Sequence, residues 1–384
     1  MNFNLNSEQQ MLQDSVRRFV ERDYGFEARR ALRLSGSTRN TAHWNTFAEN
    51  GWLAAALPEA YGGLGGTVID TVLIAQAFGR GLVVEPYMGC AVLGAQTIAA
   101  AGTPEQCERL LPALADGTRR IALAYGEAHS RGLPERSQMR AERVGDNYRL
   151  RGRKTLVAGG ADADAFVVSA VTPDDGGLTL FLVDAGTPGL TCVPLPLHDS
   201  SWAAELTLDG VTLPAQAVLG KPGQGLPALQ QALGHGTATL CAELVGGMER
   251  AIEITADYLK VRKQFGVPIG SFQTLQHRLA DMAAELEIAR SMLYALLASI
   301  MNDEAGRRDY VVSQTKSLIG RAAKFVCGQA IQLHGGIGVT EEYQIGHYFK
   351  RAIVADALLG GSDRHDARCA DYLRRTSNQG DTPQ

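Results

Sequence analysis

Residues 363–366 read Asp-Arg-His-Asp and place two carboxylates, an imidazole and a guanidinium side by side. Side chains of these kinds transfer protons or bind metal ions. An acidic residue in the first turn of a helix is also favoured by the helix dipole, which gives the cluster a structural role. We expect this segment to begin a last helix over 363–375 and not to form a metal site.

Three polar residues could act as a general base if they were buried: Glu243, His235 and Asp363. Burial raises the pKa of a carboxyl group and makes it a better proton acceptor. The alternatives are a glutamate paired with a basic neighbour, a loop or capping histidine, and an acid at a helix start. We favour these alternatives, and Glu243 is the strongest of the three candidates.

The stretch 57–66 reads Leu-Pro-Glu-Ala-Tyr-Gly-Gly-Leu-Gly-Gly and is the chain's most glycine-rich loop candidate. Glycines can cradle a phosphate, but no predicted strand precedes these, so a turn is favoured. The six cysteines are scattered without a Cys-x-x-Cys pair. We therefore expect free thiols in a reducing cytoplasm and no metal site.

Composition excludes two classes of partner. Net charge is −4 without a long Lys/Arg run, so nucleic-acid binding is not expected. Residues 1–6 carry neither a basic nor an apolar leader segment, so we expect a cytoplasmic protein. The apolar stretch 87–102 is short and rich in small residues, which predicts a buried helix and no membrane span.

The elements that must position these residues fall into three zones. Residues 1–120 show helical spacing, with Ser7 and Thr103 as expected caps. Residues 121–224 contain short apolar or alternating runs, at 121–125, 148–151, 165–169 and 178–183, beside turn residues. Residues 225–384 return to helices, with apolar residues in steps of four and three over 275–300 and a second long helix over 308–333. The pattern predicts an α+β fold with an N-terminal helical domain, a middle antiparallel β-barrel or sandwich and a C-terminal four-helix bundle.

Two segments of the last zone carry a family resemblance. One reads Arg-Lys-Gln-Phe-Gly over 262–266 with Phe-Gln at 272–273, and the other reads Gln-Leu-His-Gly-Gly-Ile-Gly over 332–338. Together they resemble the flavin-binding signature of the acyl-CoA dehydrogenases, and the helical, β, helical order extends the likeness over the whole chain. The segments 257–273 and 346–351 are most similar to the small-subunit type, such as the pimeloyl-CoA dehydrogenase small subunit.

The resemblance implies that FAD lies at a subunit interface and that this chain reaches across to its pyrophosphate and adenosine. Arg262 would pair with the pyrophosphate and Phe265 would pack on the adenosine end. Gln273 and Gln332 would hydrogen-bond the cofactor, and Gly335 and Gly336 would allow a close backbone approach. The alternative is a solvated helix-end arginine and a simple helix stop, which the ordered co-occurrence of these residues disfavours.

The other half of the family's site is eroded. The resemblance places the catalytic glutamate at Leu359 or, in some relatives, at Gly236. The family's flavin-ring segments align with 126–129 and 156–158, where the expected threonines are missing. Gly361 and Asp363 replace the threonine and glutamine that normally follow the base, and Gly234 and Thr237 replace an acid and an arginine that bind CoA.

These losses lead to a specific hypothesis. The chain is expected to be the FAD-supporting, non-catalytic subunit of a heterotetrameric acyl-CoA dehydrogenase, with the catalytic glutamate in a second subunit. The alternatives are a self-sufficient homo-oligomer that uses a displaced base such as Glu243, and a non-catalytic scaffold. By the same resemblance, an electron-transfer flavoprotein would accept the electrons, and a dicarboxylic or steroid side-chain acyl-CoA is the expected kind of substrate.

Overall fold

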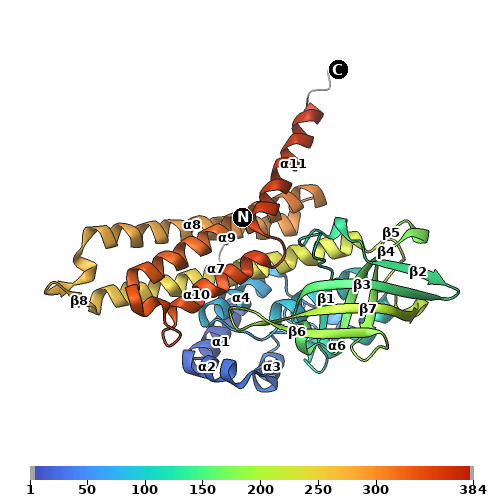
Figure 1. Cartoon of the computed structure of the whole chain (residues 1–384), viewed down its shortest axis with the longest axis horizontal. Coiled ribbons are helices and arrows are strands. Elements are labelled where there is room, and N and C mark those ends of the chain that lie inside the picture. Colours follow the sequence, from blue (N-terminus) through green and yellow to red (C-terminus); the bar gives the residue numbers. More distant parts are fainter. Residues whose placement is uncertain (1–4, 381–384) are drawn as a thin grey trace. The chain divides into compact units, whose positions relative to one another are not determined.

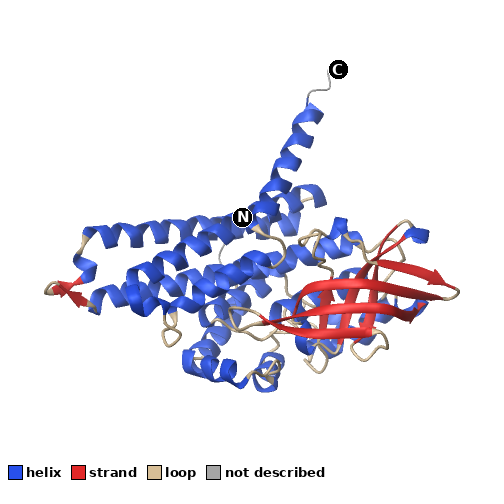
Figure 2. Cartoon of the chain, viewed as in Figure 1, coloured by secondary structure: helices blue, strands red, loops and turns tan. Residues whose placement is uncertain are grey.

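The computed structural model describes residues 5–380, and the α+β class and the helical, β, helical order are confirmed (Figures 1 and 2). The chain divides into two compact units. We call residues 1–29, 72–83 and 237–384 the helical unit, and residues 30–71 and 84–236 the β unit. The first helices of the sequence are thus shared between the two units.

The N-terminal helices are α1 (Ser7–Asp23), α2 (Phe26–Ser35), α3 (Thr41–Glu49), α4 (Val68–Gly81), α5 (Ala95–Ala101) and α6 (Pro104–Ala115). The expected cap of α1 at Ser7 is wrong by one residue, because the Asn6 side chain accepts from the Gln9 amide and completes a capping box. The cap at Thr103 is confirmed, with Pro104 at the first helical position. A buried π-helix, Tyr87–Gly94, leads directly into α5 as expected for the apolar stretch.

The C-terminal helices are α7 (Leu226–Val261), α8 (Gln273–Asn302), α9 (Ala305–His334), α10 (Ile345–Ala357) and α11 (Ser362–Gly380). The predicted stripe of α8 is buried from Met282 onward, at Met282, Leu286, Ala289, Leu293 and Leu296. Helix α9 packs against α8, α10 and α11. No helix within residues 5–380 is long and apolar enough to cross a bilayer.

Within the helical unit, α4 and α7 cross backbone to backbone. A Cβ added at Gly79 would lie 1.9 Å from the carbonyl oxygen of Glu243, and one added at Gly246 would lie 1.9 Å from that of Gln76. Neither position can hold a larger residue without moving a helix. This reciprocal contact fixes the N-terminal α4 to the C-terminal bundle.

The β unit contains a seven-stranded sheet with the order β1-β4-β2-β3-β7-β6, and β5 pairs with β4. The strands are β1 (Ile121–Ala124), β2 (Arg140–Val144), β3 (Asn147–Ala158), β4 (Ala165–Thr172), β5 (Gly177–Asp184), β6 (Leu190–Pro196) and β7 (Trp202–Pro214). The expected antiparallel pairing holds for β2-β3, β3-β7, β4-β5 and β6-β7. Strand β4 is different, because it pairs in parallel with β1 and β2.

Candidate functional site

A small hairpin closes the gap between α7 and α8. Strands β8 (Lys263–Gln264) and β9 (Val267–Pro268) pair around a two-residue loop, Phe265-Gly266. Both loop residues have positive φ, at 55° and 83°, which is the backbone of a type I′ turn. The Phe265 side chain on this turn is 92% exposed and forms a T-shaped pair with the Phe272 ring, with the ring centroids 6.2 Å apart.

Arg262 stands at the base of this hairpin. Its amide bonds the Tyr258 carbonyl, which continues α7, and its carbonyl accepts from the Ile269 amide at 2.8 Å across the hairpin. Hydrogen bonds therefore fix both the amide and the carbonyl of Arg262. Its exposed guanidinium has no hydrogen bond or ion pair within the described residues. Gln273, also exposed, is the first residue of α8.

The second motif ends α9. Gly335 takes φ 65° and terminates the helix after His334, as predicted. A Cβ added at Gly335 or Gly336 would meet no atom within 4 Å, so both glycines leave the backbone open to an approaching group. The Gln332 side chain is exposed beside them.

One aromatic contact joins the two motifs. The rings of Tyr258 and His334 stack at 4.4 Å, and the Tyr258 hydroxyl donates to the His334 carbonyl at 3.3 Å. Burial lowers the pKa of His334, so the ring is neutral near pH 7 and donates from Nδ1 to the Ala330 carbonyl. The structure thus brings Arg262, Phe265, Gln273 and the Gln332–Gly336 segment to one end of the helical unit, the end labelled β8 in Figure 1.

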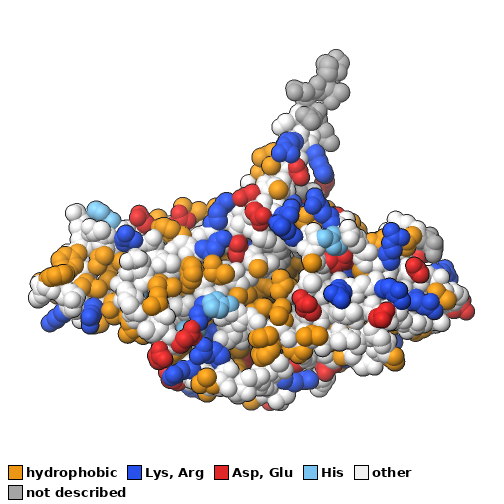
Figure 3. All heavy atoms as spheres, in the orientation of Figure 1, with side chains coloured by type: hydrophobic (Ala, Val, Ile, Leu, Met, Phe, Trp, Pro, Cys, Tyr) orange, Lys and Arg blue, Asp and Glu red, His pale blue; other side chains and the backbone are white. Residues whose placement is uncertain are grey.

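This end also exposes apolar side chains, and Figure 3 shows such side chains at the surface there. Val261 and Val339 are 74% and 72% exposed. The other large apolar residues exposed there are Phe265, Val267, Phe272 and Ile337. Apolar side chains gathered around a free cation are typical of a surface that a partner or ligand covers.

The loop Leu358–Gly361 follows α10 in the helical unit and holds a strained leucine. Leu359 has φ 59° and Gly360 has φ 95°. The fully buried Lys316 ammonium donates to the carbonyls of Asp356 and Gly360 at 3.2 and 3.1 Å. The Leu359 carbonyl accepts from His365 Nε2 at 3.0 Å. Two buried side chains therefore hold a backbone shape that a leucine disfavours.

The β unit contains a similar arrangement around Leu156. Leu156 has φ 51° and lies at a break in the β3-β7 register. Two residues earlier, the fully buried Lys154 ammonium bonds the Glu127 carboxylate at 2.6 Å and the Tyr125 carbonyl at 3.3 Å. Glu127 also accepts from the Ser137 hydroxyl and from the amides of the next two residues, which closes the loop 126–139.

The comparisons with known proteins decide the family. Family models described as the acyl-CoA dehydrogenase N-terminal, middle and C-terminal domains match residues 6–118, 122–211 and 223–371. A probable acyl-CoA dehydrogenase YngJ of Bacillus subtilis (strain 168) is 32% identical over 94% of this chain and 97% of its own length. The chain belongs to the acyl-CoA dehydrogenase family. It is therefore related to flavin-dependent oxidoreductases that act on CH–CH bonds.

Two solved structures extend the likeness to the fold. The ChsE4-ChsE5 complex from Mycobacterium tuberculosis matches with a TM-score of 0.86 at 29% identity, over 100% of both chains. Butyryl-CoA dehydrogenase from Megasphaera elsdenii matches with a TM-score of 0.87 at 26% identity, over 97% of this chain and 100% of that one. The domain boundaries expected from the sequence, 1–120, 121–224 and 225–384, stay a prediction.

The candidate bases can now be placed in this acyl-CoA dehydrogenase fold. The Glu243 carboxylate accepts from Arg351 Nε at 2.6 Å and from Arg351 Nη2 at 2.8 Å, a two-point ion pair that favours the structural role. His235 lies inside α7, so the expectation of a loop or capping histidine is wrong. Gly236 is buried in the same helix. Asp363 is exposed in the first turn of α11, as the sequence predicted.

Sequence reasoning missed the residues that shape the two strained loops. Lys154 and Lys316 are wholly buried, although lysine is rarely buried in proteins. Burial lowers the pKa of Lys154 to about 8 despite the neighbouring Glu127, and burial also lowers the pKa of Lys316. One cue was available for Lys154, because it occupies an inward-facing position of an alternating strand.

Proposed function

We propose that this chain is the FAD-supporting subunit of a heteromeric acyl-CoA dehydrogenase. It contributes Arg262, Phe265, Gln273 and the Gln332–Gly336 segment to an FAD whose ring and catalytic glutamate lie in a partner subunit. The proposal rests on the contrast between this assembled, outward-facing set and Leu359, which stands where the resemblance places the catalytic base.

The residues at the hairpin end fit a dinucleotide. The Arg262 guanidinium is unengaged within the described part of the chain and matches phosphate oxygens. The open backbone at Gly335 and Gly336 admits a close approach, and the exposed ring of Phe265 offers a face for adenine. When bound, FAD would supply the hydride acceptor for the acyl group, and the residues of this protein would only hold and orient the cofactor.

The base positions support a non-catalytic role. Leu359 and Gly236 cannot accept a proton, and loss of a general base costs roughly 10²–10⁴ in rate. The two-point pair with Arg351 commits Glu243 to a structural contact. A partner with an intact glutamate restores the missing step. The ChsE4-ChsE5 structure is of a two-component complex, which makes it a direct precedent among the relatives.

The rest of the proposed reaction follows the family. An acyl-CoA thioester with a bulky or dicarboxylic chain is the proposed substrate. An electron-transfer flavoprotein in the same cytoplasmic compartment is the proposed electron acceptor.

The test is to purify the chain alone and co-expressed with an acyl-CoA dehydrogenase, encoded beside it, that retains the glutamate. Flavin absorbance per chain and acyl-CoA oxidation with an artificial electron acceptor are then measured. We expect little activity from the chain alone and full activity from the complex. Full activity from the chain alone would exclude the proposal.

A matched pair of variants in the partner and in this chain sharpens the test. Replacing the partner's glutamate with glutamine should abolish turnover of the complex and leave flavin bound. Glu243→Gln in this chain should leave turnover unchanged. Loss of turnover with retained flavin in Glu243→Gln would instead identify Glu243 as the base of a self-sufficient enzyme.

A further inference from the structure

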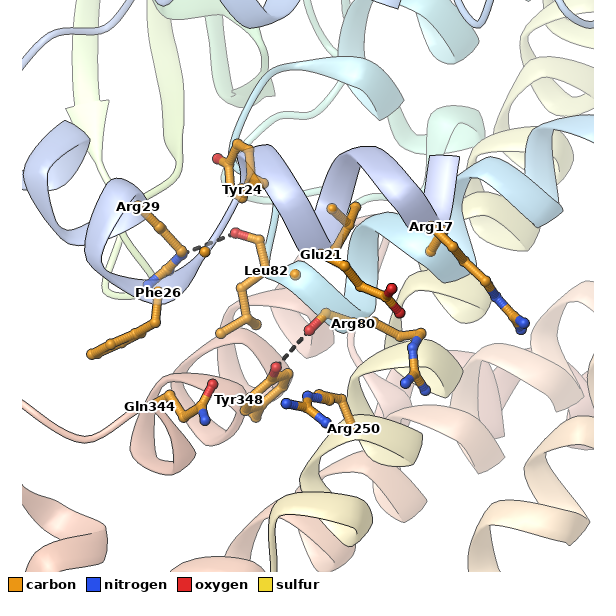
Figure 4. Close-up of a pocket in the computed structure, with 14 residues that line it drawn as sticks. Arg17, Glu21, Tyr24, Phe26, Arg29, Arg80, Leu82, Arg250, Gln344 and Tyr348 are labelled. Carbon is orange, nitrogen blue, oxygen red and sulfur yellow. Dashed lines mark hydrogen bonds between the residues drawn. The ribbon is translucent and has the colours of Figure 1, made fainter. Parts of the chain in front are cut away.

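A cavity lined by arginines lies within the helical unit. It has a volume of about 330 Å³ and is walled by residues of α1, α2, α4, α7 and α10 (Figure 4). Arg17, Arg29, Arg80 and Arg250 line it, and Glu21 is the one acidic residue in the lining. A cavity with this balance of charge favours an anion.

Part of the wall is held rigid before any ligand arrives. Arg29 is 3% exposed, and its Nε donates to the Leu82 carbonyl at 2.9 Å. Leu82 itself has φ 53°, a strained conformation for a leucine. The Tyr348 hydroxyl donates to the Arg80 carbonyl at 2.5 Å and ties α10 to the end of α4. Figure 4 shows both of these bonds at the rim of the cavity.

The four guanidinium groups differ in how many donors they have already used. Arg80 bonds Glu249 at 3.2 Å and Glu253 at 2.8 Å, so its charge is balanced. Arg250 gives one donor to Glu253 at 3.0 Å. Arg17 makes no hydrogen bond or ion pair within residues 5–380. Since a guanidinium carries N–H groups on each nitrogen, Arg17 and Arg250 retain most of their donors.

We infer that this cavity binds a small oxyanion, a phosphate or a carboxylate group, through Arg17 and Arg250. Such a group would accept charge-assisted hydrogen bonds from α1 and α7 together and would link the first helix to the C-terminal bundle. Glu21, on the same face of α1, opposes the ligand by like-charge repulsion. This site uses none of the residues assigned to FAD, so it stands or falls separately from the proposed function.

The experiment titrates the full-length chain with sodium phosphate and, separately, with sodium malonate. Binding is followed by calorimetry and by the thermal unfolding midpoint, against sodium chloride at equal ionic strength. We expect saturable binding of at least one anion, and the anion that binds identifies the ligand as a phosphate or a carboxylate. Ligand binding to the folded chain should raise the unfolding midpoint.

Four variants make the assignment specific. Arg17→Gln and Arg250→Gln should each weaken binding about tenfold, as expected for loss of a charge-assisted hydrogen bond. Glu21→Gln should strengthen binding severalfold, and this gain is informative even if an arginine variant folds poorly. Arg18→Gln is the matched control, because Arg18 is exposed on α1 beside Arg17 and lies outside the lining.

The inference is overturned by any of three results. One is the absence of saturable binding beyond the chloride control. Another is an equal loss of affinity in Arg18→Gln and Arg17→Gln, which would indicate a nonspecific charge effect. The third is an unchanged affinity in Glu21→Gln when circular dichroism shows the native fold.

Discussion

The hairpin end of the helical unit and the loops that hold Leu359 and Leu156 differ in the side chains that they carry on a fixed backbone. At the hairpin end, Arg262 and Phe265 project outward from a fixed backbone, and within residues 5–380 the one ring contact of Phe265 is with Phe272. At Leu359 and Leu156, buried lysines hold the backbone, but the side chains presented are apolar. Under the proposed function, the first region would retain its cofactor-binding groups, whereas the two loops would retain a fixed backbone without a catalytic side chain.

The Lys154–Glu127 pair tests how much the scaffold of the β unit matters. Lys154→Met leaves the Glu127 carboxylate buried without its cation and should lower the free energy of unfolding by about 3–5 kcal/mol. Urea denaturation measures the loss. The double variant Glu127→Gln with Lys154→Met should recover part of it, because the glutamine carbonyl can still accept from the Ser137 hydroxyl. An unchanged free energy of unfolding in Lys154→Met would mean that the Lys154–Glu127 pair does not stabilise the loop 126–139.

His365, which holds the Leu359 carbonyl, should make stability depend on pH. Burial, assisted by Lys316, lowers its pKa from 6.5 to about 4. Because the folded pKa is the lower one, the unfolded chain takes up the proton first as pH falls. Stability should be complete above pH 6.5 and should decrease by up to about 3 kcal/mol towards pH 4.

Urea denaturation at pH 6.5, 5.5 and 4.5 measures this loss. His365→Gln should flatten the curve, whereas His277→Gln, at an exposed position of α8, should leave its slope unchanged. His334 and His347, whose pKa values burial also lowers, would account for any residual slope. Equal slopes in the parent chain and His365→Gln would contradict the prediction.

Arg262→Gln tests the other side of the comparison. In the complex with the catalytic partner, it should weaken flavin binding by roughly 10- to 100-fold, since a charge-assisted hydrogen bond is worth about 1.5–3 kcal/mol. It should leave the stability of the isolated chain unchanged. Lys260→Gln is the control, because Lys260 is 72% exposed in the last turn of α7 and pairs with the exposed Asp257. Equal flavin loss in both variants would remove Arg262 from the cofactor site.

The smallest expected effect concerns the strain at Leu359. Leu359→Gly should be more stable than Leu359→Ala by about 1 kcal/mol, because only glycine adopts positive φ freely. The order should reverse at Leu318, a half-buried position within α9, where glycine is the poorer helix former. Thermal unfolding of the four variants measures both differences. If the glycine variant were the more stable one at both positions, or the alanine variant at both, the prediction of backbone strain at Leu359 would be wrong.

Much of the fold could be predicted from the sequence, but not the pairings that depend on distant contacts. The four apolar runs over 121–183 became β1, β3, β4 and β5 because buried strands carry continuous or alternating apolar residues. Strand β2 was missed because its exposed sequence, Arg-Ala-Glu-Arg-Val, is mostly charged. Strand β6 was missed because it contains Pro194 and Pro196.

The candidate site, like the fold, has parts that the sequence predicted and parts that it did not. The motif residues were predicted by resemblance, and the structure places them together through Tyr258 and His334. The alternating pattern of β3 marks Lys154 as an inward-facing position, but no local pattern identifies the groups that accept from Lys154 and Lys316. Those groups, among them the carbonyls of Tyr125 and Gly360, are defined by the tertiary fold.

The hairpin tip has a consequence for the cell that makes this chain. The Phe265 ring is 92% exposed on a two-residue turn, so unrelated proteins can bind to it nonspecifically while no specific partner covers it. Under the proposed function, synthesis of this chain in excess of the second subunit would leave the Phe265 ring uncovered and would favour aggregation and degradation. Matched production of the two polypeptides, as from adjacent genes on one transcript, would avoid this loss.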